Sequence, residues 1–116
     1  MMTPFLLIAA HALCDFALQN DLMANAKNRF KAHPIHRHVP WFYWLASHSL
    51  IHGAAVALIL HSPTLGLMEA CFHFIIDDEK CRGSFGIHTD QILHILLKGF
   101  LYSWYVFLIR PSGFPY

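Results

Sequence analysis

Pairs of metal-ligand side chains four residues apart recur inside the apolar segments of this chain. The five pairs are His11–Asp15, His48–His52, Glu69–His73, His73–Asp77 and Asp90–His94. Residues four apart lie on the same face of an α-helix, one turn above the other. Four helices would therefore each carry a stripe of imidazole and carboxylate groups. Such groups are costly inside an apolar bundle unless each has a polar partner, and a divalent metal ion is the most economical partner.

The composition is that of an integral membrane protein. Hydrophobic residues make up 56% of the 116 residues and charged residues 13%, whereas soluble domains carry roughly 25% charged residues. The length suits one domain. The formal net charge of +1 gives no basis for binding nucleic acid, so no nucleic-acid partner is expected. The three cysteines form no C-x-x-C motif and predict neither a disulfide framework nor a zinc knuckle.

Four apolar segments predict four helices, over residues 3–20, 39–60, 64–81 and 89–110. A membrane span takes about 20 residues, with a range of roughly 17–25. The second and fourth segments fit this length easily, while the first and third are shorter and interrupted by polar residues. The predicted fold class is all-α: an integral membrane four-helix bundle with up-down-up-down order. Residues 1–116 would form this single transmembrane domain, with a basic cytoplasmic loop at about residues 21–40.

Basic residues concentrate in two of the three connections. The first connection holds Lys27, Arg29, Lys31 and Arg37, and the third holds Lys80 and Arg82. The short HSPT turn between the second and third helices holds neither Lys nor Arg. By the positive-inside rule, the two basic connections are cytoplasmic and both termini are outside. The chain is therefore expected to cross a membrane several times, with the lipid bilayer as a partner.

The expected helix directions predict that the polar stripes meet. Counted at about 1.5 Å per residue from the cytoplasmic ends, all of them fall in one slab in the cytoplasmic half. Asp77 and Asp90 lie nearest the cytoplasm, and His11, His52 and Glu69 lie deepest. On the second helix, small residues at positions 49, 53 and 57 allow close approach of a neighbouring helix, although generic packing explains this spacing equally well.

The charges of the slab favour bound metal. Asp15, Glu69, Asp77 and Asp90 supply four negative charges, of which Lys98 offsets one at most. Two divalent ions would neutralise the set, and a site of one or two ions is expected. A mixture of imidazole and carboxylate suits zinc first, with manganese or iron as alternatives, more than calcium or magnesium. A metal-free His–carboxylate hydrogen-bond network or a proton relay would also account for the same stripes.

Each polar residue of the stripes receives an expected role. The predicted metal ligands are His11, Asp15, His48, His52, His73, Asp77, Asp90 and His94. Glu69 is the candidate general base, and Lys98 is the candidate group that holds a substrate anion. Gln19 and Gln91 are expected to orient the ligands from outside the coordination sphere.

Several segments also resemble a known family. The segments HALCDFALQ, MANAKNR, HFIIDDEK and DQILH, with the helix histidine at position 48, resemble a family of small bacterial and phage membrane proteins of unknown function. The matching residues are His11, Asp15, Phe16, Gln19, Met23, Ala24, Lys27, His48, His73, Asp77, Lys80, Asp90, Gln91 and His94. The resemblance implies a small helical inner-membrane protein with a phage association. The pattern also resembles, more distantly, membrane-bound metal-dependent hydrolases; His52 and Glu69 belong to it less clearly.

Three functions remain in competition. The leading hypothesis is a metal-dependent hydrolase that acts at the cytoplasmic face on a phosphate- or acyl-containing substrate, such as a lipid, because a bound metal can lower the pKa of water to about 7. The second is a non-enzymatic membrane adaptor or phage accessory protein with a structural metal or polar network. The third is a proton or metal-ion pathway, which the apolar outer half of the fourth helix disfavours. Assembly into an oligomer is compatible with all three.

Overall fold

The chain folds into helices joined by short connections. The structure is a computed structural model that describes residues 2–109. Its helices are α1 (Met2–Ala12), α2 (Asp21–Ala26), α3 (Trp41–Leu60), α4 (Pro63–Arg82) and α5 (Ile87–Trp104). Three shorter turns are η1 (Leu13–Ala17) and η3 (Tyr105–Ile109), which are π-helical, and η2 (Pro34–Arg37), which is a 3-10 turn. The predicted all-α class is confirmed, while the predicted end of the last helix at residue 110 lies outside the described residues.

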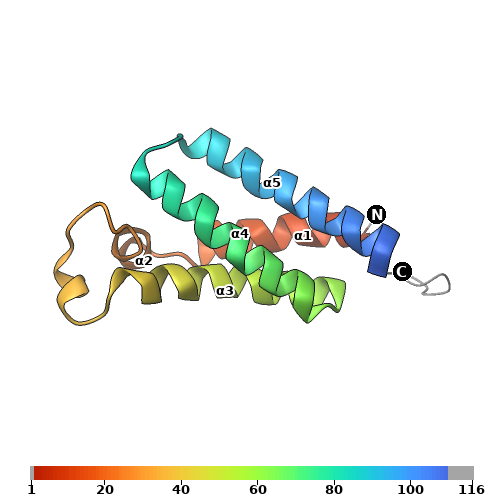
Figure 1. Ribbon diagram of the computed structural model, residues 1–116, viewed down its shortest axis with the longest axis horizontal. Helices are drawn as coiled ribbons and strands as arrows, with labels where there is room; N and C mark the ends of the chain where they lie inside the picture. The colour runs from red at the N-terminus through yellow and green to blue at the C-terminus, as the bar shows by residue number, and fades with distance from the viewer. Residues whose placement is uncertain (1, 110–116) are drawn as a thin grey trace.

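The four long helices run alternately in opposite directions (Figure 1). Each contacts two others: α3 packs against α1 and α4, and α5 also packs against α1 and α4. The linker with α2 and the turn between α4 and α5 lie at the same end of the molecule (Figure 1). The two connections that carry the basic residues therefore meet at one end, as the alternating directions predicted.

A contact between two glycines brings α3 and α4 together. A Cβ atom on Gly53 would lie 2.5 Å from the backbone oxygen of Gly66 and 2.9 Å from Cβ of Ala70. Only a glycine pair permits such an approach, because any side chain would overlap the opposite backbone. The small-residue stripe therefore packs against α4, and this contact sets His48 and His52 beside that helix.

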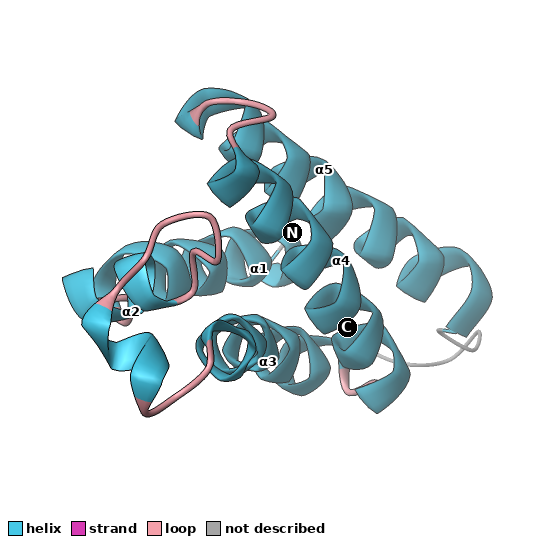
Figure 2. Ribbon diagram, turned by 60° about the vertical axis from the view of Figure 1, so that its left-hand side comes forward, coloured by secondary structure: helices cyan, strands magenta, loops and turns pink. Residues whose placement is uncertain are grey.

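The first predicted helix is shorter than expected and is followed by a different turn. Helix α1 ends at Ala12, and the N–H of Leu18 donates to the carbonyl of Leu13 at 2.9 Å, which closes the π-helical turn η1. The expected loop at residues 21–40 contains α2, whose first turn is capped by Asn20 accepting a hydrogen bond from the N–H of Met23. Helix α2 packs against α3, and Figure 2 shows it with its connecting loops beside the start of that helix.

Many polar side chains are buried, and many large apolar side chains are exposed. The buried side chains include five histidines, three carboxylates and two lysines, whereas Phe5, Leu58, Leu96 and Phe107 are more than 60% exposed. Two helical segments, at residues 41–60 and 87–108, are long and apolar enough to cross a membrane. The apolar first segment is shorter, and α4 does not qualify because its last two turns are charged. Four membrane spans were expected, and the structure supports two of them on these criteria.

Candidate metal centre

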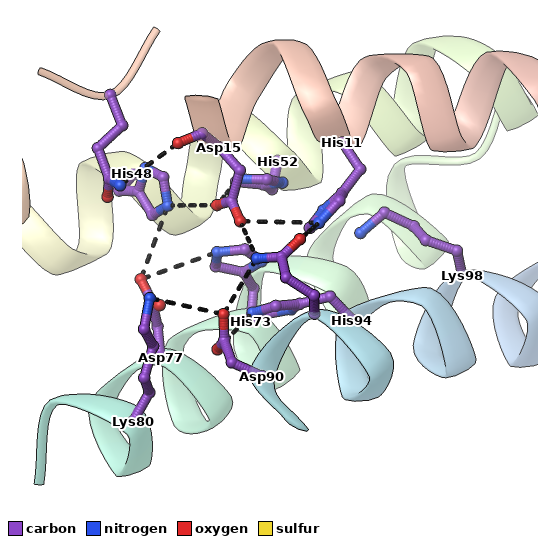
Figure 3. A network of polar contacts seen from close by, with 12 residues as sticks. His11, Asp15, His48, His52, His73, Asp77, Lys80, Asp90, His94 and Lys98 are labelled. Carbon is purple, nitrogen blue, oxygen red and sulfur yellow. Dashed lines mark hydrogen bonds and ion pairs between the residues drawn. The ribbon is translucent and has the colours of Figure 1, made fainter. Parts of the chain in front are cut away.

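Five buried histidines from four helices gather at one place in the interior (Figure 3). His11 comes from α1, His48 and His52 from α3, His73 from α4 and His94 from α5. The ring centroids of His52 and His73 are 3.8 Å apart, and those of His73 and His94 are 4.2 Å apart. The polar stripes expected on four separate helices therefore face one another.

Asp15 lies against two of these rings. Its Oδ1 atom accepts a hydrogen bond from Nε2 of His48 at 3.3 Å and lies 3.2 Å from Nε2 of His52. In a tetrahedral zinc site with bonds of about 2.0–2.1 Å, neighbouring ligand atoms are about 3.3 Å apart. Asp15 belongs to the π-helical turn η1, and π-helical turns often lie at functional sites.

Two groups of ligand atoms converge within the cluster. Asp15, His48, His52 and His73 form the first, and His73, Asp77 and His94 form the second; the ligand atoms of each group lie within 4.8 Å of one another. His73 is common to both groups. A neutral imidazole has one unprotonated nitrogen, so His73 can serve one metal ion unless it loses both protons and bridges two. The geometry thus suits one ion better than two.

Three of the histidines lack hydrogen bonds. Both ring nitrogens of His52, His73 and His94 are buried and have no hydrogen-bond partner among the described residues. Nε2 of His94 lies 3.2 Å from Oδ1 of Asp90, but this contact is not aligned as a hydrogen bond. An unpaired buried polar group costs about 1–3 kcal/mol. Imidazole nitrogens that face one another and a carboxylate fit a bound divalent ion, which would satisfy several of them together.

Lysines accompany three of the four carboxylates. Nζ of Lys98 donates to Oε1 of Glu69, and Nζ of Lys80 lies 3.7 Å from Oδ2 of Asp90. The third pair is formed by Lys27 and Asp77, whose Nζ and Oδ2 atoms are 2.5 Å apart. Asp15 faces no lysine or arginine among the ion pairs of the described residues. With neutral histidines, three lysines and four carboxylates leave one negative charge, fewer than the sequence suggested.

Lys27 is a residue of the site that the helical spacing did not reveal. The sequence pattern assigned it to the basic loop, yet it is 4% exposed and reaches Asp77, 50 residues away in the sequence. Its Nζ atom also donates to Oε1 of Gln19 at 2.5 Å. The only signal was its place in the MANAKNR segment that carries the family resemblance. Helix α2 turns the chain back towards the interior and so brings Lys27 to the cluster.

Comparison with known proteins places the chain in a family. The model of a family described as a protein of unknown function, DUF3307, matches residues 3–109. The chain belongs to the DUF3307 family. No curated protein and no solved structure matches it. The expected membership in a family of unknown function is therefore confirmed, while the more distant link to metal-dependent hydrolases and the phage association stay predictions.

Two predicted ligands of this DUF3307 protein, His11 and Asp90, lie outside both converging groups. Nε2 of His11 lies 2.9 Å from Oε1 of Gln91, to which it donates, and Nε2 of the same amide donates to Oδ2 of Asp15 at 2.7 Å. Asp90 contacts His94 rather than the first group. His11 and Asp90 therefore lie beside the converging groups, in positions suited to orienting ligands. Gln91 donates to Asp15, a member of the first group, whereas Gln19 donates to the backbone oxygen of Asp15 and accepts from Lys27. The orienting roles expected of both glutamines stay predictions.

Proposed function

We propose that this protein is a membrane-embedded metalloprotein that binds one divalent ion between Asp15, His48, His52 and His73. The observation that carries the proposal is the set of buried imidazole nitrogens without hydrogen bonds around a carboxylate that no lysine neutralises. One ion with two positive charges, together with a bound hydroxide, would balance the remaining negative charge. A single ion therefore suffices where the sequence allowed two.

Zinc is the first candidate, with manganese or iron as alternatives. Three imidazoles and one carboxylate are borderline donors that these metals accept, whereas calcium and magnesium prefer oxygen ligands. The neighbours of the ligands also fit such a centre. Gln91 donates to Oδ2 of Asp15, so an amide group holds the orientation of this ligand from outside the coordination sphere.

We place the centre in the bacterial inner membrane, in a multi-pass protein. Two helices of sufficient length and apolarity, the exposed apolar side chains and the buried polar cluster all support this location. The basic connections share one end of the molecule, which is the arrangement that the positive-inside rule requires for a cytoplasmic face. The N- and C-terminal ends of the chain would then lie outside.

Within this proposal, the protein is a hydrolase of a phosphate- or acyl-containing substrate. The metal would supply a polarised oxygen and an activated water molecule. Glu69 is the group that would accept a proton. Its Oε1 atom accepts a hydrogen bond from Nζ of Lys98 and lies 3.6 Å from Nδ1 of His73. Its Oε2 atom is buried and has no hydrogen-bond partner among the described residues. Lys98 would balance the charge of Glu69 in this cluster and offer a cation to a substrate anion.

A structural centre is the second candidate, because the donors are so deeply buried. The side chain of Asp15 is 10% exposed, and the three histidines of the same group are at most 1% exposed. Structural metal sites are closed and fully coordinated, whereas catalytic sites keep an open position. In that case the protein is a membrane adaptor or accessory protein whose fold depends on the metal.

Elemental analysis of protein purified in detergent tests the metal. We expect about one equivalent of metal, and chelation should lower the thermal midpoint because the ion binds the folded state; a ligand at 1,000 times its Kd contributes about 4 kcal/mol. Asp15→Asn should lose most of the metal, while Asp78→Asn, which removes an ion pair with Arg29 at the surface, should keep it. Absence of metal together with an unchanged melting curve under chelation would overturn the proposal.

Glu69→Gln separates the hydrolase from the structural centre. If Glu69 accepts a proton, the variant keeps its metal and fold but loses turnover on phosphate- and acyl-containing lipids. Glu79→Gln, which removes a surface partner of Arg82, serves as the matched control and should retain turnover. A metal-loaded wild-type protein without activity on either lipid class would exclude the hydrolase and leave the structural centre.

A further inference from the structure

A basic cavity lies beside the polar cluster, where the linker that follows α2 meets the end of α4. Its volume is about 540 Å³, within the roughly 300–1,000 Å³ range of small-ligand sites. Four cationic side chains line it: Lys27, Lys31, Lys80 and Arg82. Amide groups of Gln19, Asn25 and Asn28 add hydrogen-bond donors, and no carboxylate of the described residues lines it. The cavity is therefore suited to an anion.

The inner wall of this cavity is shared with the candidate metal centre. Lys27 lines the cavity and also donates to Oδ2 of Asp77, which belongs to the second group of converging ligands. Asp77 in turn lies 3.6 Å from Nε2 of His48. An anion in the cavity would thus stand one side chain away from the cluster, at the end of the molecule that carries the basic connections.

We propose that this cavity binds a phosphate group. Phosphate carries up to two negative charges and several acceptor oxygens, so it can use several cations and amide donors together, and the planar guanidinium of Arg82 can contact two of its oxygens. A carboxylate offers one charge and two oxygens, so it can use fewer of these donors together than a phosphate can. This proposal rests on the proposed function: the phosphate group would be the part of the substrate that the cavity recognises.

Lys27 couples the two sites. A phosphate in the cavity competes with Asp77 for the ammonium of Lys27. Release of Asp77 from that ammonium leaves more negative charge beside His48, a proposed ligand, and so favours a bound cation. Phosphate binding should therefore tighten metal binding, and metal should tighten phosphate binding by the same factor, because coupling between two sites is reciprocal.

Calorimetry on the protein as purified tests the cavity. Inorganic phosphate would be titrated into detergent-purified protein without chelator, and vesicles with and without phosphatidic acid would be offered to the same protein. Lys31→Gln combined with Arg82→Gln should weaken phosphate binding about tenfold or more, since a hydrogen bond to a charged group contributes about 1.5–3 kcal/mol. Both side chains are exposed, so the fold should survive, which circular dichroism would verify.

Arg37→Gln is the matched control, because Arg37 is an exposed basic residue of the same linker that does not line the cavity. Binding of inorganic phosphate supports a soluble phosphate compound, and binding of phosphatidic acid vesicles alone supports a lipid headgroup. The proposal is overturned if neither source binds, or if the double variant and Arg37→Gln bind equally well. A failure of phosphate to bind contradicts the proposed cavity site, whereas the metal content of the same preparation tests the metal centre separately.

Discussion

At the scale of single residues, His73 is the most constrained side chain of the cluster. Its ring lies between those of His52 and His94, it is fully buried, and it is the one residue present in both groups of converging ligands. Asp90, by contrast, contacts the cluster through His94. Removing these two side chains should therefore have unequal effects on bound metal.

We expect His73→Ala to abolish metal binding, because either group loses a ligand. Asp90→Asn should leave most of the metal affinity in place, because Asp90 contacts His94, which is not one of the proposed ligands. His88→Ala, at an exposed position of α5, is the control and should bind metal normally. Competition with a chelating dye measures all three affinities. Full metal content in His73→Ala would exclude both groups as the binding site.

The sequence predicted the stripe residues better than their partners. Spacing of four within apolar segments identifies histidines and carboxylates that share a helix face, because helical geometry is local. It cannot show that Lys27 leaves its loop to pair with Asp77, since that contact depends on how the linker folds back over 50 residues. For the same reason, the sequence-based charge count overstated the negative charge that a metal must balance.

At the scale of helices, close approach of α3 and α4 positions the histidines. The backbone oxygens of Gly53 and Gly66 each lie 2.5 Å from the position that a Cβ atom on the other residue would occupy. The contact tolerates no added methyl group without separation of the two helices. The stack formed by His52 and His73 should therefore depend on these two positions.

We expect Gly53→Ala to destabilise the protein by about 1–3 kcal/mol, the usual cost of overpacking. The same change should weaken metal binding because it moves His52 away from His73. Gly99→Ala is the matched control on α5, where a Cβ atom meets nothing within 4 Å; it should be neutral or stabilising by up to about 1 kcal/mol. Thermal unfolding in detergent measures both. Equal stability of the two variants would contradict the importance of this contact.

The π-helical turn η1 is a feature that helical periodicity did not predict. His11 and Asp15 were expected one above the other on a regular α-helix. Their polar atoms do meet, because Nε2 of His11 lies 3.7 Å from Oδ2 of Asp15, but the chain between them enters the π-helical turn after Ala12, and Oδ1 of Asp15 faces α3. An extra residue in a turn redirects the next segment without changing the apolar pattern, so periodicity alone could not predict it.

At the scale of the whole molecule, the fold has two chemically different ends. The basic connections lie at one end, and the turn between α3 and α4 lies at the other (Figure 1). The all-α class and the alternating helix directions followed from the apolar segments. The number of membrane spans did not follow from the apolar segments. Helix α4 is long enough to cross a bilayer, but its C-terminal half is charged, and composition alone does not show whether such a helix lies in the bilayer.

Cysteine labelling of cells tests this arrangement. In a variant without the three native cysteines, His33→Cys should react with a membrane-impermeant reagent only after the cytoplasmic side is opened. Thr64→Cys, at an exposed position of the opposite turn, should react from outside. The reverse pattern would overturn the proposed orientation, and labelling of both positions from one side would contradict a membrane-crossing α3.

The burial of Lys27 has a consequence for proteolysis. Lys27 is bound to Asp77 in the interior, and two residues later Arg29 forms a two-point ion pair with Asp78 at 3.0 and 3.1 Å. A protease that cuts after lysine and arginine therefore meets its first two cleavage points while both side chains are held by α4. Cleavage at these points would require the linker to detach from α4. The rate of cleavage would therefore measure how often the linker opens and exposes the polar cluster.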